Sequence, residues 1–99
     1  MSFVWNVTIR KDAKSGGYAY DPPALTGVEI GDQIVWANDD EVAHWPGLVT
    51  PTGVNDTYFM AYQIAPHEPS GAFVPGVSGT VTYVDSLDPQ GPTGTIAVD

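Results

Sequence analysis

The stretch that most constrains the fold lies at residues 80–98, near the end of the chain. Its two β-branched runs, Thr80 to Val84 and Thr93 to Val98, are separated by a loop rich in proline, glycine and aspartate. β-Branched residues favour strands, and such loop residues favour turns. The stretch therefore predicts two consecutive strands, a pairing that belongs to an all-β protein.

Composition supports an all-β reading of the whole chain. The 99 residues include eleven glycines and nine prolines, and no long helical period is present. Short strands with frequent turns fit this composition, and the length suits one hydrophobic core. No linker, repeat or low-complexity tract interrupts the pattern, so we expect residues 1–99 to form a single domain.

Three strands can be placed before the middle of the chain. Residues 3–10 alternate apolar and polar side chains, and residues 33–38 do the same around Trp36. Residues 18–25 contain Pro22 and Pro23, and because proline cannot donate a hydrogen bond to a neighbouring strand, we expect a sheet edge or an extended loop there. Residues 26–30 should continue as a strand. Gly31 and Asp32 predict a tight turn between the second and third of these strands.

The region after Trp45 is harder to read. Prolines and glycines interrupt it until residues 58–62, which show the next strand-like alternation. Residues 72–74 look like a further strand, and Pro75 to Gly79 looks like the turn of a hairpin leading into residues 80–84. Such a hairpin would bring the loop around His67 beside Asp85.

Two segments together resemble the cupredoxins, the blue-copper family. The run Val28–Asn38 matches a hydrophobic strand, Gly-Asp, and a Val-x-Trp-x-Asn strand, and residues 39–44 match the acidic loop that leads to a copper-ligand histidine. Residues 79–98 match the closing strand, loop and strand. The resemblance implies a cupredoxin-like Greek-key β-sandwich of about seven to eight strands, and it places His44 at the ligand position.

The copper ligands of that family are altered here. Asp85 stands where the resemblance puts the cysteine, Asp88 stands where it puts the second histidine, and the loop holds no methionine. A type 1 copper centre needs a thiolate, and the chain has no cysteine, which excludes that centre. We therefore expect no cofactor of this kind.

A different metal remains open. His44, His67, Asp85 and Asp88 offer two nitrogen and two oxygen donors, a set suited to zinc or copper(II), and Asp39 to Glu41 would add a field that attracts cations. The alternative is that these residues have structural roles only. His44 would then bond a loop carbonyl, and Asp85 and Asp88 would accept hydrogen bonds from backbone N–H groups within turns. In a metal-free pocket we expect both aspartates to face the rim and contact water, because ionised carboxylates need solvent or donors. We also expect the acidic loop to raise the pKa of His44.

The functional expectations follow from charge and from missing motifs. Three basic and twelve acidic residues give a net charge of −9, which disfavours nucleic acid, and no apolar run is long enough for membrane insertion. No nucleophile–base arrangement points to an enzyme. We expect a non-catalytic binding or structural module acting through a protein partner or self-association; the alternative is the metal-binding rim. The resemblance favours a periplasmic or extracellular protein whose signal is missing from this sequence.

Overall fold

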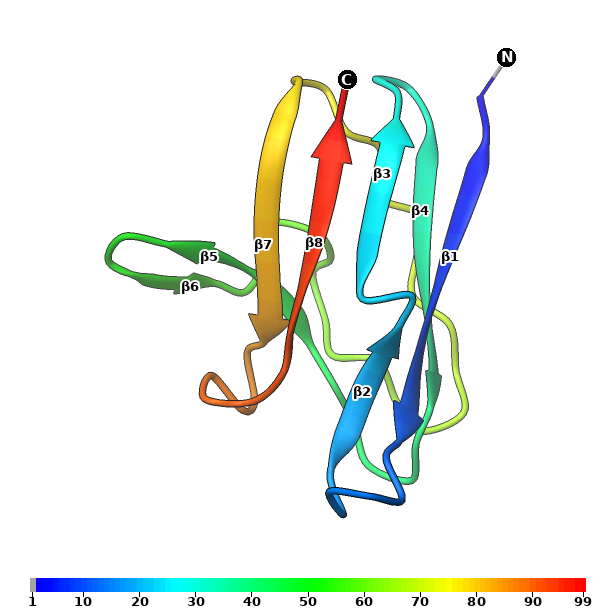
Figure 1. Cartoon of the computed structure of the whole chain (residues 1–99), viewed down its shortest axis with the longest axis vertical. Coiled ribbons are helices and arrows are strands. Elements are labelled where there is room, and N and C mark those ends of the chain that lie inside the picture. Colours follow the sequence, from blue (N-terminus) through cyan, green and yellow to red (C-terminus); the bar gives the residue numbers. More distant parts are fainter. Residues whose placement is uncertain (1) are drawn as a thin grey trace.

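The structure is a computed structural model, which describes residues 2–99 and contains eight strands in two sheets. The strands are β1 (Val4–Lys11), β2 (Tyr18–Asp21), β3 (Ala24–Val28), β4 (Gln33–Asp39), β5 (Pro46–Thr50), β6 (Gly53–Asn55), β7 (Gly79–Asp85) and β8 (Thr93–Val98). One sheet has the order β2-β1-β4, and the other has the order β3-β8-β7-β5-β6. The predicted all-β Greek-key sandwich is confirmed, and Figure 1 shows its two layers.

The chain changes sheet between β2 and β3. Pro22 and Pro23 lie at that point, and β2 and β3 are the outermost strands of their respective sheets. Proline cannot donate a ladder hydrogen bond, so the chain leaves one sheet and joins the other where its donors are missing. The predicted edge position of this segment is confirmed.

The turn before β4 is held by a buried aspartate. Gly31 has a φ of 93°, in the left-handed region that glycine adopts without strain. The carboxylate of Asp32 accepts hydrogen bonds from the backbone N–H of Phe3, the backbone N–H of Glu29 and the indole N–H of Trp5, each at 3.0 Å. One side chain thus joins the start of β1 to the β3–β4 turn.

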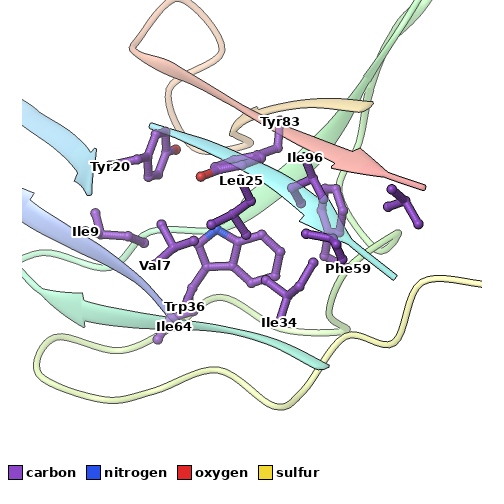
Figure 2. Packing of buried hydrophobic residues seen from close by; sticks show 12 residues of the cluster. Val7, Ile9, Tyr20, Leu25, Ile34, Trp36, Phe59, Ile64, Tyr83 and Ile96 are labelled. Carbon is purple, nitrogen blue, oxygen red and sulfur yellow. The ribbon is translucent and has the colours of Figure 1, made fainter. Parts of the chain in front are cut away.

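The core lies between the two sheets. Trp36 of β4 is fully buried, and its ring packs edge-on against the ring of Tyr83 of β7, with centroids 5.4 Å apart. Figure 2 shows Val7 and Ile9 of β1 on one side of this pair and Ile96 of β8 on the other. Val7 and Ile9 of β1 are buried, as are Ile34 and Trp36 of β4, so the alternation predicts the inward face of these strands. It fails at its start, where Phe3 is 59% exposed.

The middle of the chain differs from the prediction. Residues 46–50 and 53–55 form the antiparallel β5–β6 hairpin, which projects from the body in Figure 1, whereas residues 58–62 form no strand. The predicted hairpin between residues 72–74 and 80–84 is also wrong. Phe73 pairs with Ile34 of β4, in the opposite sheet, while β7 pairs with β5 and β8.

Candidate functional site: a buried aspartate–histidine–aspartate cluster

The loop between β4 and β5 is fixed by side-chain hydrogen bonds before it reaches His44. The amide of Asn38 donates to the backbone carbonyls of Val42 and Ile64, at 2.9 and 3.1 Å. Its carbonyl oxygen accepts the backbone N–H of Asp40. His44 then exchanges two backbone hydrogen bonds with Ile64. These contacts direct the His44 side chain into the end of the sandwich.

Both ring nitrogens of His44 contact buried carboxylates. Nδ1 lies 2.6 Å from Oδ2 of Asp85, and Nε2 lies 2.8 Å from Oδ2 of Asp40. The exposed fractions are 2% for His44, 2% for Asp85 and 5% for Asp40. Three ionisable side chains are therefore joined through one imidazole ring beneath the surface. Figure 1 shows β4 and β7, which end at Asp39 and Asp85, both running away from the chain termini.

Asp85 is held in place by the strand pairing. Because Pro46 of β5 pairs with Asp85 of β7, the residues just before β5 lie beside the last residue of β7. The second carboxylate oxygen of Asp85 accepts the backbone N–H groups of Trp45 and Leu87, both at 2.9 Å. The expected water exposure of Asp85 is wrong, because these donors replace the water that an ionised carboxylate otherwise needs.

The two aspartates of the loop after β7 therefore behave differently. Asp85 accepts the N–H of Leu87, as the turn-residue interpretation predicted. Asp88 is exposed, and its carboxylate accepts the hydroxyl of Tyr18 at 3.0 Å rather than a backbone N–H. Tyr18 also packs against the imidazole of His44, with ring centroids 4.4 Å apart, so the Tyr18 ring covers the cluster.

The geometry determines the charge state of the cluster. Both ring nitrogens of a histidine are donors only when the imidazole carries its proton. Burial lowers the pKa of His44, but its hydrogen bonds with Asp85 and Asp40 outweigh burial and raise that pKa above its ordinary value. The predicted direction of the pKa shift is confirmed, although the expected bond to a loop carbonyl is replaced by the two carboxylates.

The two carboxylates respond in the opposite direction. Burial raises the pKa values of Asp40 and Asp85, but hydrogen bonds with His44 and with backbone N–H groups outweigh burial and hold both values below the ordinary range. The cluster is therefore an imidazolium between two carboxylates, and opposite charges in contact favour the charged forms.

The other predicted ligand, His67, lies apart from this cluster. Its side chain is 62% exposed, and Nδ1 is 3.9 Å from Oδ1 of Asp39. Its φ of 62° places it in a tight left-handed turn of the segment that follows Ile64. Of the four residues predicted as ligands, the structure brings His44 and Asp85 into contact and links Asp88 to them through Tyr18.

No group of three or more His, Cys, Asp or Glu side chains within residues 2–99 is arranged to hold a metal ion. In the cluster the two carboxylates lie against different nitrogens of one ring, so their oxygens do not converge on a common point. The residues also do not fit type 1 copper. The chain supplies no thiolate, and the carboxylate of Asp85, at the cysteine position of the resemblance, is bonded to His44, Trp45 and Leu87.

Several solved structures have the same fold as this chain. A purple cupredoxin from Nitrosopumilus maritimus superposes with a TM-score of 0.77 at 22% identity, over 96% of this chain and 99% of that one. The chain has the cupredoxin fold. A mutant plastocyanin of a fern matches with a TM-score of 0.73 at 19% identity, over 95% and 99% of the two chains.

A third cupredoxin-fold structure extends the match. Amicyanin from Paracoccus versutus matches with a TM-score of 0.71 at 19% identity, over 99% of this chain and 81% of that one. No family model matches the sequence, and no curated protein matches it either. Within residues 2–99, no helix is long and apolar enough to cross a membrane.

Two members of the site are not singled out by the sequence. Asp40 is one of three acidic residues in its loop, and Tyr18 carries no signal of a functional role. The i, i+4 spacing of Asp40 and His44 was the available signal, because the Asn38 side chain turns the chain back on itself between them. Nothing near Tyr18 in the sequence indicates that β2 passes over His44.

Proposed function

We propose that this chain is a non-catalytic, metal-free cupredoxin-like module that works by contact with a protein partner. The Asp40–His44–Asp85 cluster then holds together the end of the sandwich that a metal would otherwise organise. The single observation that supports this proposal is the engagement of both imidazole nitrogens by buried carboxylates. A histidine bound in this way has no free lone pair for a metal or for a substrate proton.

The same geometry argues against catalysis at this position. A general base must reach the proton that it removes, and His44 is buried beneath Tyr18 with both nitrogens occupied. Loops and edges around a rigid sandwich commonly carry recognition. Protein contact is therefore the economical role, and the resemblance favours an exported protein.

The alternative is a rim site for zinc or copper(II) made by His44, His67, Asp85 and Asp88. It remains a prediction, and the contact between His44 and Asp85 is the observation in its favour, since an ion could replace the proton between them. Such a site would require His67 to move from Asp39 toward Asp85.

Metal analysis separates the two proposals. The protein is purified without chelator, its metal content is measured, and its Tm is recorded with and without a tenfold excess of Cu²⁺ or Zn²⁺. We expect far less than one metal per chain and a Tm shift below about 1 °C, because an ion that binds the folded state would raise Tm. One metal per chain, lost in both His44→Ala and His67→Ala, would establish the rim site instead.

A further inference from the structure

An extended segment outside β4 forms one wall of a groove. Figure 1 shows the chain between β6 and β7 passing outside β4. The backbone of this segment bonds β4 at intervals: Asn38 donates to Glu68, Ser70 donates to Trp36, and Phe73 exchanges two bonds with Ile34. Residues 68–73 thus act as an additional, irregular edge to the β2-β1-β4 sheet.

The groove lies between residues 68–72 and residues 59–65. Its volume is about 450 Å³, and both walls come from this single connection. Met60, Ile64 and Pro69 give the groove apolar surface, while Glu68 gives it a carboxylate. Tyr62, also in the lining, is 81% exposed, the largest exposed fraction among the large apolar side chains of residues 2–99.

Several backbone N–H groups along both walls have no hydrogen-bond partner among residues 2–99. Among residues 2–99, the N–H groups of Tyr62, Gln63, Gly71 and Ala72 have no backbone or side-chain acceptor. A peptide that lies extended along a sheet edge satisfies such groups with its own backbone, and pockets beside the edge select its side chains. The groove therefore offers what an added strand requires.

Charge selects the chemistry of the occupant. The chain carries a net charge of −9, and two of its three basic side chains, Arg10 and Lys11, are paired with Asp21 and Glu41. Glu68 lines the groove and has no ion-pair partner among residues 2–99. An acidic surface attracts basic segments and repels acidic ones.

We propose that the groove between residues 59–65 and 68–72 binds an extended segment of a protein partner in which basic side chains alternate with apolar ones. The segment adds backbone hydrogen bonds to Gly71 and Ala72, packs an apolar side chain against Tyr62, and places a basic side chain at Glu68. This inference rests on the proposed function and names the surface and the partner chemistry that the function needs.

The test uses the whole chain labelled with ¹⁵N and three blocked eight-residue peptides. The first alternates valine with arginine, the second replaces each arginine with glutamate, and the third is the first with alternate backbone nitrogens methylated. We expect the first peptide to shift amide resonances of residues 59–72 and to slow hydrogen exchange at Gly71 and Ala72. The second and third should bind at least about tenfold more weakly, since they lose charge complementarity or edge hydrogen bonds.

Variants locate the binding surface. Tyr62→Ala and Glu68→Gln should each weaken the arginine peptide about three- to tenfold, in the range of single exposed contacts. Glu29→Gln is the matched control, because it removes the same charge from an exposed position in the β3–β4 turn, and we expect it to leave affinity unchanged.

Three outcomes would contradict the proposal that the groove binds such a segment. They are no binding of the arginine peptide, equal binding of the glutamate peptide, or amide resonance shifts confined to the β2 or β3 edge. Shifts confined to the β2 or β3 edge would still be compatible with a protein-contact function, but at a different surface. A stoichiometric rim metal would instead remove the proposed function itself, and it is measured separately from peptide binding.

Discussion

At the scale of single residues, Asp85 forms hydrogen bonds with two parts of the chain, the segment before β5 and the loop after β7. Its carboxylate contacts the imidazole of His44 and accepts the backbone N–H groups of Trp45 and Leu87. Removing an ionised carboxylate from water costs several kcal/mol, and only a full set of partners offsets that cost. Three charge-assisted contacts supply that set, which explains how an ionised aspartate can be stable at this buried position.

Removal of the Asp85 carboxylate should therefore destabilise the protein strongly. We expect Asp85→Ala to lower the free energy of unfolding by roughly 3–5 kcal/mol, because it removes one of the two carboxylates paired with the buried His44 and leaves two part-buried N–H groups unpaired. Urea unfolding followed by tryptophan fluorescence measures the change. Asp88→Ala is the matched control, and its exposed carboxylate should contribute about 1 kcal/mol or less. Equal losses for the two variants would show that the buried cluster is not stabilising.

The sequence predicted which residues meet here better than it predicted their surroundings. The resemblance correctly placed His44 and Asp85 at the same end of the sandwich. The expectation that Asp85 faces water failed, since the donors come from Trp45 and Leu87 backbone groups, and a sequence does not show where backbone N–H groups point. Residue type does not distinguish Asp40 from Asp39 and Glu41, because the path of the loop decides which of the three acidic side chains points toward His44.

At the scale of elements, alternation predicted the strands well wherever it was unbroken. β1, β4, β7 and β8 all lie within or close to the expected ranges. The β5–β6 hairpin was missed because Pro46 and Gly47 are turn residues by propensity, yet here both are buried in a strand. Tertiary contact decides this: an added Cβ at Gly47 would collide with Val54 of β6 and with Ser86, so β5 needs a glycine where the chain packs closely.

The hairpin predicted for residues 72–84 failed for a related reason. Pro75 and Gly76 are typical of the turn between two hairpin strands. The strand with which a short apolar run such as residues 72–74 pairs, however, depends on which sheet has a free edge. Phe73 meets Ile34 because β4 is an edge strand, whereas both sides of β7 are already taken by β5 and β8. Local turn chemistry carries no information about such competition.

Pairing between β7 and β8 leads to a prediction about Gly94. Gly94 lies opposite Tyr83 in the ladder, and a methyl group at Gly94 would overlap atoms of the Tyr83 ring. Because Tyr83 is fully buried against Trp36, it has no room to retreat. We expect Gly94→Ala to lower the free energy of unfolding by about 1–3 kcal/mol through overpacking, measured by urea titration.

Gly76→Ala is the control for this substitution. Nothing lies within 4 Å of a Cβ at Gly76, and its φ is outside the left-handed region, so we expect little or no loss of stability. If Gly94→Ala were as stable as Gly76→Ala, the contact between Tyr83 and Gly94 would not be as close as described.

At the scale of the whole molecule, stability reflects a balance between the buried cluster and a net charge of −9. The raised pKa of His44 means that its contribution is fully present below its ordinary value of 6.5 and is lost as pH rises through the raised value. The lowered pKa values of Asp40 and Asp85 mean that their contributions are present above 3.8 and are lost as pH falls through the lowered values.

We therefore expect the free energy of unfolding to be largest between about pH 4 and pH 6.5 and to decline on the alkaline side as His44 loses its proton. Self-repulsion of the acidic surface, which grows with pH, acts in the same direction. Urea unfolding at intervals from pH 3 to pH 10 measures the profile. His67→Gln should keep the alkaline decline, and His44→Gln should flatten most of it; a decline unchanged in His44→Gln would assign it to surface charge alone.

The fold as a whole was more predictable than any of its parts. Cupredoxin-fold chains that share about a fifth of their residues with this one superpose over nearly its full length, so the sandwich depends on the inward pattern and a few turns rather than on particular side chains. Functional residues lack this redundancy, since one substitution at position 85 changes what the site can hold.

The contacts of Asp85 have a consequence for protein engineering. A designer who places a sulfur ligand at position 85 also removes the carboxylate that accepts the backbone N–H groups of Trp45 and Leu87, so the two loops would loosen just when a metal needs them rigid. Designing a metal site on this scaffold therefore begins with new acceptors for those two amides, and the ligand is installed afterwards.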